Sequence, residues 1–295
     1  VMGYVWAGMG VFDAVNHAMT TVSTAGFSTK DYSFLTYQNI WIDWVAILFM
    51  LLGSINFALH FLALKQRTIF HYFKNTEVKL LILLLICVVI AMTTQLIMTT
   101  QDLNGHALPD YAPAAHFALF NSVSIITSTG YSNADFAAWP PAALLLILIL
   151  MFVGGCSGST TGGVKLMRII LGFKHSMREL YKLLHPAAVR HIKLNGVSIS
   201  SQTLQAVWAF LGMYVGTFLI ASLMLAFLGM DLISAFSAAA ASLTNVGPGL
   251  GMVGPYTGYG GLSDSMLSVL CLTMLLGRLE LFTVLILFLP SFWRK

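Results

Sequence analysis

The sequence predicts an all-α integral membrane protein built from repeated units, each with a membrane span, a short re-entrant helix, a glycine loop and a second span. Three observations predict this fold class. Of the 295 residues, 58% are hydrophobic and only 9% are charged, with a mean hydropathy of +0.83, which is too little charge to cover a soluble domain. A short apolar segment ending in a glycine loop occurs three times, and the basic residues gather in three regions.

Five apolar segments are long enough to form the predicted spans. They lie at about residues 41–64, 80–98, 142–173, 203–229 and 265–290. Because Val1 already lies in apolar sequence with no basic region before it, we expect a fragment that begins in the remnant of a sixth span.

The basic residues predict how these spans are oriented. Thirteen of the fifteen Lys and Arg residues fall in 65–79, 165–193 and 294–295, which the positive-inside tendency places in the cytoplasm. The external segments then carry Asp31, Asp102, Asp110, Asp135 and Asp264. Topology and contacts with lipid headgroups account for the net charge of +4, so nucleic-acid binding is not required.

The three glycine loops align without gaps as STAGFS (23–28), TSTGYS (127–132) and TNVGPG (244–249). Each follows a segment of small residues that is too short to span the membrane, which indicates a re-entrant pore helix. Each is followed by a span with a glycine near its middle: Gly53, Gly154 and Gly277. Repeats of this kind arrange their copies around an axis, where we expect the loops to meet.

The composition of the loops favours a monovalent cation. Rings of backbone carbonyls can replace the water shell of such an ion, and glycine permits the dihedral angles that turn the carbonyls inward. No Asp, Glu, Lys or Arg lies between a pore helix and its glycine, which disfavours divalent cations and anions. Asp31 and Asp135, each five residues after a glycine, would enrich cations at the mouth, whereas the third repeat has Met252 there.

The segment 142–173 is too long for one span, and its middle reads GGCSGSTTGG. A helix cannot persist through this composition, so we expect a broken span with an unwound loop under the filter, flexible because few side chains pin it. Arg278, near the middle of the last span, should face the pore as an electrostatic barrier and bond to carbonyls of this loop. The repeat alignment places Ser54 and Gly155 at the same level. Glu280 should not pair with Arg278, because two residues separate their side chains by more than half a turn.

These motifs, together with GGCSGSTTGGVK (154–165) and GRLE (277–280), resemble the TrkH-type membrane subunits of the bacterial Trk/Ktr potassium-uptake systems, in the Trk/Ktr/HKT superfamily. The resemblance implies a pseudo-fourfold, potassium-channel-like arrangement of span, pore helix, filter and span, with one further unit upstream of Val1. Residues 1–64 would be the second repeat without its N-terminal part, 80–173 the third and 201–295 the fourth. Residues 65–79 and 174–200 would be cytoplasmic.

The resemblance implies the site residues one by one. Backbone carbonyls of the filter would bind potassium at Thr24, Ala25, Gly26, Phe27, Ser128, Thr129, Gly130, Tyr131, Asn245, Val246, Gly247 and Pro248. The gate would comprise Gly154, Gly155, Ser157, Gly158, Ser159, Thr160, Thr161, Gly162, Gly163 and Arg278. A potassium-channel filter has a second glycine two places after the first, where this chain has Ser28, Ser132 and Gly249. The two serines should loosen the outermost site and leave passage of sodium open.

The function expected is potassium uptake through a gated, channel-like pore, with no enzymatic activity. An ion-coupled potassium symporter is the alternative, although it would need more titratable groups at the midplane than Arg278 and Glu280. An intramembrane serine protease is a remote alternative, in which Ser157 of GCSG would need His60 as its base.

The resemblance also implies a homodimer in the bacterial inner membrane, regulated by a cytosolic nucleotide-binding subunit of the TrkA type. The basic segment 165–193 would be its docking surface or a lipid-facing helix hairpin. Potassium would be the only metal ion, and no organic cofactor is expected. Cys87, Cys156 and Cys271 show no paired spacing, so they suggest neither a disulfide framework nor a metal site.

Overall fold

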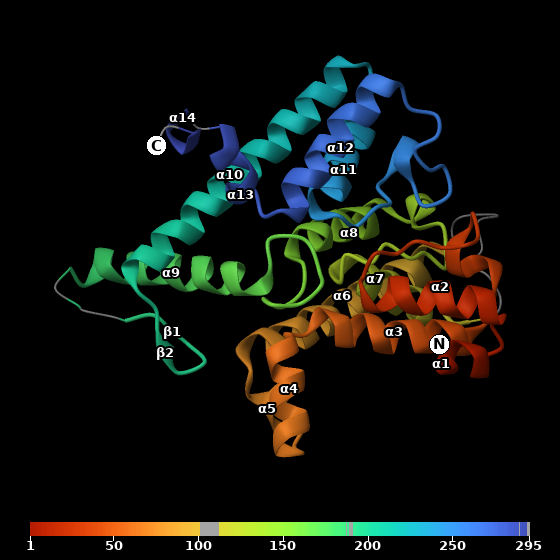
Figure 1. Ribbon diagram of the computed structural model, residues 1–295, viewed down its shortest axis with the longest axis horizontal. Helices are drawn as coiled ribbons and strands as arrows, with labels where there is room; N and C mark the ends of the chain where they lie inside the picture. Colours follow the sequence, from red (N-terminus) through yellow and green to blue (C-terminus); the bar gives the residue numbers. More distant parts are fainter. Residues whose placement is uncertain (101–111, 187, 189–190, 289, 294–295) are drawn as a thin grey trace.

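The computed structural model describes residues 1–100, 112–186, 188, 191–288 and 290–293, and it is helical apart from one short hairpin. Asp102, Asp110, Arg294 and Lys295 therefore lie outside the described residues. The helices form three units in chain order, which we name after their loop glycines (Figure 1). The predicted all-α, repeat-based fold is confirmed.

The Gly26 unit comprises α1 to α5, the Gly130 unit α6 to α9, and the Gly247 unit α10 to α14. In the Gly26 unit the elements are α1 (Met2–Trp6), α2 (Val11–Val22), the 3₁₀ helix η1 (Ser33–Thr36), α3 (Ile40–Ser54), α4 (Phe57–Gln66) and α5 (Phe70–Lys74). In the Gly130 unit they are α6 (Thr76–Thr100), α7 (Ala114–Ile126), η2 (Phe136–Ala138), α8 (Pro141–Val153) and α9 (Leu166–Leu184). In the Gly247 unit they are α10 (Ser201–Phe227), α11 (Leu232–Thr244), η3 (Gly251–Val253), α12 (Asp264–Arg278), α13 (Phe282–Leu285), η4 (Ile286–Phe288) and α14 (Pro290–Trp293).

Each unit contains the short helix that the repeat predicts. These pore helices are α2, α7 and α11, with 12, 13 and 13 residues. Ten residues of α7 and ten of α11 are buried, because each packs among helices of its own and the neighbouring units. Only three residues of α2 are buried, so one side of the Gly26 unit is left without a packing partner in the described structure.

The predicted spans are only partly confirmed. Among the described residues, two helices are long and apolar enough to cross a membrane unbroken, at Thr76–Met98 and Ser201–Phe227. The predicted spans at 41–64 and 265–290 are each a pair of helices bent at a break, by 97° between α3 and α4 and by 108° between α12 and the segment Phe282–Phe288, so each could form one span only as a broken one. The segment 142–173 is interrupted as predicted, since α8 ends at Val153 and α9 begins at Leu166.

The break after α3 has a physical cause that hydropathy cannot detect. Ile55 is extended, and the Asn56 side chain accepts a hydrogen bond from the Ala58 N–H and so starts a new helix. Ser54 O, which a continuing helix would use, accepts instead from Cys156 N at 2.9 Å. The loop after α8 therefore satisfies backbone groups that the break exposes.

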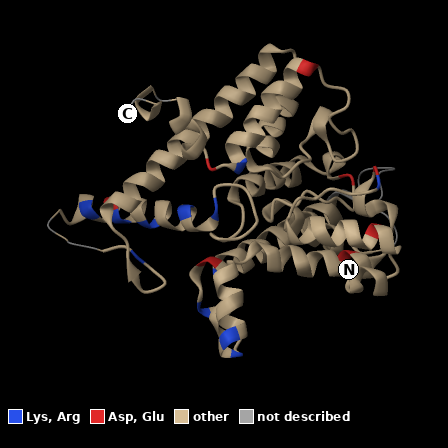
Figure 2. Ribbon diagram, viewed as in Figure 1, with Lys and Arg blue, Asp and Glu red and all other residues tan. Residues whose placement is uncertain are grey.

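The basic segment is a helix followed by a strand hairpin, not two helices. In this hairpin β1 (Lys193–Leu194) pairs antiparallel with β2 (Val197–Ser198). Asn195 and Gly196 between them both have positive φ, as a tight hairpin turn requires. Figure 2 shows Lys and Arg along α9 and on α4 and α5, which project from the end of α3.

Candidate ion filter and gating loop

The three glycine loops share an alternating backbone. The residue two places before each glycine, like the glycine itself, lies in the left-handed region, while the residue between them does not. The φ angles are +50° and +71° for Thr24 and Gly26, +53° and +82° for Ser128 and Gly130, and +56° and +105° for Asn245 and Gly247. This conformation is costly for the three residues that are not glycine, so its recurrence marks a site held by its surroundings. Alternation of this kind turns successive carbonyls to one side.

The loops also fit against one another in a fixed order. A Cβ atom on Gly26 would lie 1.6 Å from Thr129 O, and one on Gly130 would lie 1.9 Å from Val246 O. Gly26 thus leaves room for the carbonyl of Thr129, the residue before Gly130. Gly130 in turn leaves room for the carbonyl of Val246, the residue before Gly247. Three loops from distant parts of the chain therefore meet around one centre, as the repeat predicts.

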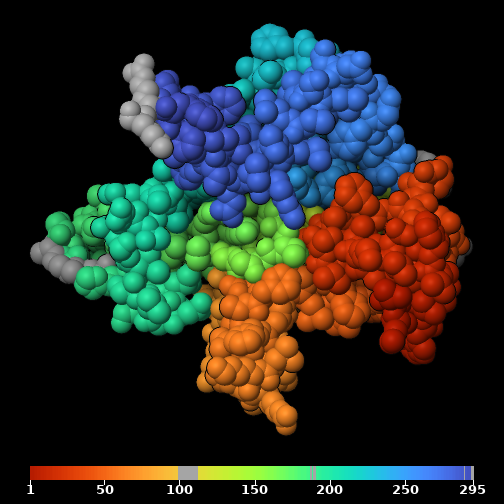
Figure 3. Space-filling view, viewed as in Figure 1, coloured from red at the N-terminus to blue at the C-terminus, as the bar shows by residue number. Residues whose placement is uncertain are grey.

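The arrangement is open between the Gly26 and Gly247 units. Within the described part of the chain, a Cβ atom on Gly247 would meet no atom within 4 Å, and a cavity of 540 Å³ separates the two loops. Its lining includes Thr24, Ala25, Phe27, Asn245, Val246, Gly247, Tyr259 and Arg278. Phe27 is 73% exposed beside this space, whereas its counterpart Tyr131 is fully buried. Figure 3 shows a strip of the Gly130 unit (light green) between the orange part of the Gly26 unit and the blue part of the Gly247 unit.

Polar side chains of the pore helices hold the outer ends of the loops. His17 Nε2 is 2.9 Å from Ser28 Oγ, and Leu250 N donates to Ser237 Oγ at 2.9 Å. Ser132 Oγ donates to Ala134 O at 2.8 Å. The two serines at the second-glycine position are therefore both hydrogen-bonded, and whether the outermost site is loose stays a prediction. Sequence reasoning missed these supports.

A pair of charges lies beside the Gly26 loop. Lys30 Nζ is 3.5 Å from Asp13 Oδ2. The Thr29 hydroxyl, which donates to Asp13 Oδ1 at 2.6 Å, holds the pKa of this carboxyl below its usual range, with Lys30 contributing in the same direction. Asp135 accepts from Ala137 N and begins η2. Its side chain is thus positioned at the outer end of the Gly130 loop.

The gating loop, which we define as residues 154–165, lies directly against the bases of two filter loops. A Cβ atom on Gly162 would lie 2.1 Å from Thr244 O at the end of α11, so only glycine fits there. On the other side, Thr24 Oγ1 donates to Thr160 Oγ1 at 3.1 Å. The loop therefore occupies the space under the filter.

The expectation that few side chains pin this loop is wrong for the observed conformation. Two backbone hydrogen bonds join the loop to the break between α3 and α4. Cys156 N donates to Ser54 O, and Gly158 O accepts from Phe57 N at 3.1 Å. Internally, Thr161 Oγ1 accepts from Gly155 N at 3.1 Å. These bonds form because neighbouring breaks offer backbone groups that no helix satisfies.

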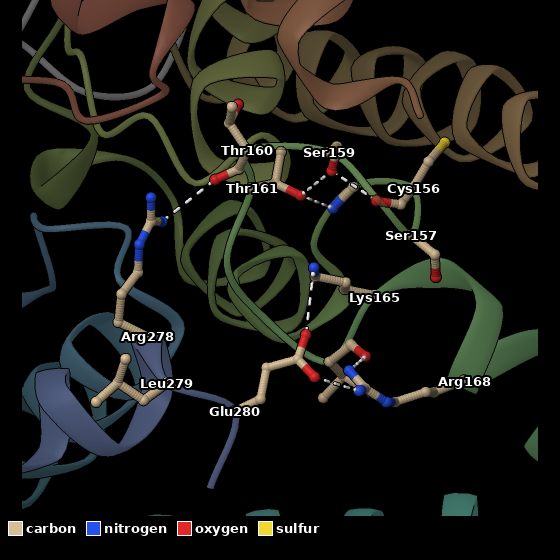
Figure 4. Close-up of polar contacts among 12 residues, drawn as sticks. Cys156, Ser157, Ser159, Thr160, Thr161, Lys165, Arg168, Arg278, Leu279 and Glu280 are labelled. Carbon is tan, nitrogen blue, oxygen red and sulfur yellow. Dashed lines mark hydrogen bonds and ion pairs between the residues drawn. The ribbon is translucent and has the colours of Figure 1, made fainter. Parts of the chain in front are cut away.

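Three charged residues hold the loop along its length, and Figure 4 shows two of them, Arg278 and Glu280. Arg278 Nη1 donates to Thr160 O at 3.2 Å, so the predicted bond to a loop carbonyl is present, while its role as a barrier stays a prediction. Glu280 does not pair with Arg278. It contacts Lys165 Nζ at 3.4 Å and Arg168 Nη2 at 2.9 Å, at the C-terminal end of the loop.

The third charged residue is Glu77, at the start of α6, which sequence reasoning also missed. It is 5% exposed, and one of its carboxylate oxygens accepts from Ser157 N at 2.7 Å. The only available sequence signal is a lone carboxylate at the beginning of an apolar span. The proposed protease partner His60 is engaged elsewhere, because its ring nitrogens lie 2.9 Å from Tyr72 Oη and 2.9 Å from Leu52 O.

Comparison with known proteins places the chain in a family. The family model TrkH, described as a cation transport protein, matches residues 5–295. The Trk system potassium uptake protein TrkH of Halomonas elongata is 40% identical over 296 residues, which cover 100% of this chain and 59% of that protein. TrkH of Escherichia coli K12 is 37% identical, with 98% of this chain and 58% of that protein covered. The crystal structure of the potassium transporter TrkH from Vibrio parahaemolyticus superimposes with a TM-score of 0.91 at 38% identity, covering 99% of this chain and 61% of that one. The chain thus spans less than two thirds of the length of these relatives, and it belongs to the TrkH family of cation transport proteins.

Proposed function

We propose that this chain forms three quarters of a gated pore for potassium uptake. The observation that carries the proposal is the set of three loops with the same alternating backbone, each fitted against the next around one centre. Carbonyl rings bind a dehydrated monovalent cation without the deep well that a carboxylate would create, so the ion can leave quickly. A relative that aligns with the whole of this chain is named as a potassium uptake protein.

A fourth unit would complete the ring by placing its own glycine loop in the cavity of 540 Å³ between the Gly26 and Gly247 loops. The cavity favours this view because residues of two filter loops line it, and because among the described residues no carbonyl faces Gly247 as one faces Gly26 and Gly130. The length of the relatives beyond the matched region leaves room for such a unit.

The gate would act by moving residues 154–165 out from under the filter. In the observed conformation the loop is held from both sides, and Arg278 places a positive charge beside the cavity that the filter residues line. A cation would meet both a steric and an electrostatic barrier there. We therefore assign the observed conformation to a closed state.

Regulation would come from the cytoplasmic face of the inner membrane. The helix α9 carries Lys174, Arg178 and Lys182, and it begins where the gating loop ends. These properties favour a docking surface for a cytosolic nucleotide-binding subunit of the TrkA type, in a complex with a homodimer of the membrane protein. Pull-down of that subunit by wild type and by a variant with all three residues changed to Gln would test the assignment.

The decisive experiment measures ion flux. The full-length protein that contains this chain would be placed in liposomes with a potassium gradient and with no proton or sodium gradient. Passive potassium flux supports a channel-like pore, while flux that requires a second gradient supports a symporter. Gly130→Ser should abolish either kind of flux if the loop is the pathway, and unchanged flux would reject the filter assignment.

A further inference from the structure

Four polar side chains form a buried network behind the filter loop of the Gly130 unit. Asp43 lies on α3, His116 and Asn121 lie on α7, and Asn133 is the third residue after Gly130. Their exposed fractions are 0%, 4%, 0% and 0%. Asp43 lies in the first turn of α3 and is fully buried, and a buried carboxylate is costly unless hydrogen bonds satisfy it.

The hydrogen bonds run in a defined direction towards the carboxylate. Asn133 Nδ2 donates to Asp43 Oδ2 at 2.8 Å, and His116 Nε2 lies 2.9 Å from the same oxygen. The Asn133 amide nitrogen can only donate, so its bond to the carboxyl oxygen fixes which way this amide points. The Asn133 amide oxygen therefore points away from Asp43, where it accepts from Asn121 Nδ2 at 2.8 Å. One charge thus orients the whole chain of bonds.

The network joins two units at the outer end of the filter. Asp43 belongs to the Gly26 unit, whereas Asn133 directly follows the loop 127–132 of the Gly130 unit. The loops of the other two units are supported at similar places by the imidazole of His17 and the hydroxyl of Ser237. The support of the Gly130 loop differs from these because it ends on a buried carboxylate, and charge-assisted bonds are stronger and geometrically more defined.

We propose that Asp43, acting through Asn133, is a positioning residue that sets the spacing of the Gly130 filter carbonyls and thereby the preference for potassium over sodium. The inference rests on the proposed function of the loops as an ion filter. A filter distinguishes the two ions by the spacing and number of its carbonyls. Since Ser132 replaces the second glycine, the loop depends on outside supports such as this network to hold its outer end.

The test compares the potassium-to-sodium permeability ratio of the full-length protein in proteoliposomes. Asn133→Ala removes the link to the loop and leaves the Asp43–His116 pair intact. We expect the ratio to fall about tenfold, the factor that corresponds to about 1.4 kcal/mol, because a bond to a buried charge is lost. Asn121→Ala should shift the ratio in the same direction. The double variant should be no worse than Asn133→Ala, because both changes act through one amide.

Ser222→Ala is the matched control, because Ser222 is equally buried and its hydroxyl bonds within α10 to Phe218 O. It should leave the ratio unchanged. Asp43→Asn gives a second variant of nearly identical size, expected to lower the ratio as well. An unchanged ratio in Asn133→Ala would overturn the proposal, as would failure of both Asn133→Ala and Asp43→Asn to assemble, since the network would then be purely structural. Absence of potassium flux in wild type would instead reject the proposed function.

Discussion

Replacement of Gly130 by alanine tests the central feature of the site, the close approach of one filter loop to the next. The added Cβ atom would lie 1.9 Å from Val246 O and 2.9 Å from Pro248 Cδ. Because Gly130 has a φ of +82°, alanine there also costs about 1–2 kcal/mol in backbone strain. The substitution therefore disturbs two loops at once.

The geometry sets the size of the effect. Real Cβ atoms essentially never approach another heavy atom closer than 3.0 Å, so the two loops must separate by about 1 Å. A misplacement of about 1 Å can lower the rate of an enzyme about 100-fold, and we apply the same factor to carbonyls that must be accurately spaced around an ion. We expect potassium flux to fall by about that factor. The assay is tracer uptake into liposomes that contain the full-length protein.

Gly212→Ala is the matched control on α10. A Cβ atom there would meet nothing within 4 Å, and alanine in a helix is favoured over glycine by about 1 kcal/mol. Its flux should equal that of wild type. If Gly130→Ala elutes as wild type in detergent and still conducts normally, the reasoning about the loop contact is refuted.

Gly247→Ala extends the same reasoning to the open side of the ring. In the described residues its Cβ atom would have free space, so the strain of a +105° φ would be the main cost. If a fourth unit fills the cavity, the variant of the full-length protein should lose as much flux as Gly130→Ala. A mild effect would argue that no carbonyl faces this glycine.

The remaining predictions concern the gate and the outer filter. Arg278→Ala removes the bond to Thr160 O and a positive charge, so flux should rise severalfold; identical flux would contradict the barrier. Glu77→Ala leaves Ser157 N without its buried acceptor, at a cost of about 1.5–3 kcal/mol to the observed loop conformation. Basal flux should therefore increase, whereas Glu179→Ala on exposed α9 should not change it. Ser132→Gly supplies the missing second glycine, and the measured potassium-to-sodium ratio should rise; a lower ratio would show that the hydroxyl bond to Ala134 O matters more than backbone freedom.

The pore helices and loops could be predicted because their signals are local. A run of small residues followed by a glycine loop, repeated three times, is visible in the sequence, and the structure has α2, α7 and α11 at those places. The interruption at 154–163 was also predictable, since five glycines in ten residues cannot form a helix in lipid.

The breaks after α3 and α12 could not be predicted in the same way. LLGSINF and LLGRLEL remain apolar enough for continuous spans, and at the break after α3 a group far along the chain replaces a helical hydrogen bond. Ser54 O bonds to a residue of the gating loop, about a hundred positions later. Asp43 was missed for the same reason, because its partners lie 73 and 90 residues away.

The contacts of residues 154–165 also constrain how the proposed gate can open. Its first part is held by Glu77, its middle by Arg278 and its end by the pairs of Glu280 with Lys165 and Arg168. Arg278 and Glu280 lie at the break between α12 and α13, where Glu280 and Leu281 both have positive φ. Lys165 and Arg168 lie at the start of α9. Movement of α9 must therefore either separate these two residues from Glu280 or displace the segment between α12 and α13 together with α9. In the second case Arg278 moves away from Thr160 at the same time. A force on the basic helix would then release the loop at its middle and its end together, while Glu77 and the α3 carbonyls keep its first part in place.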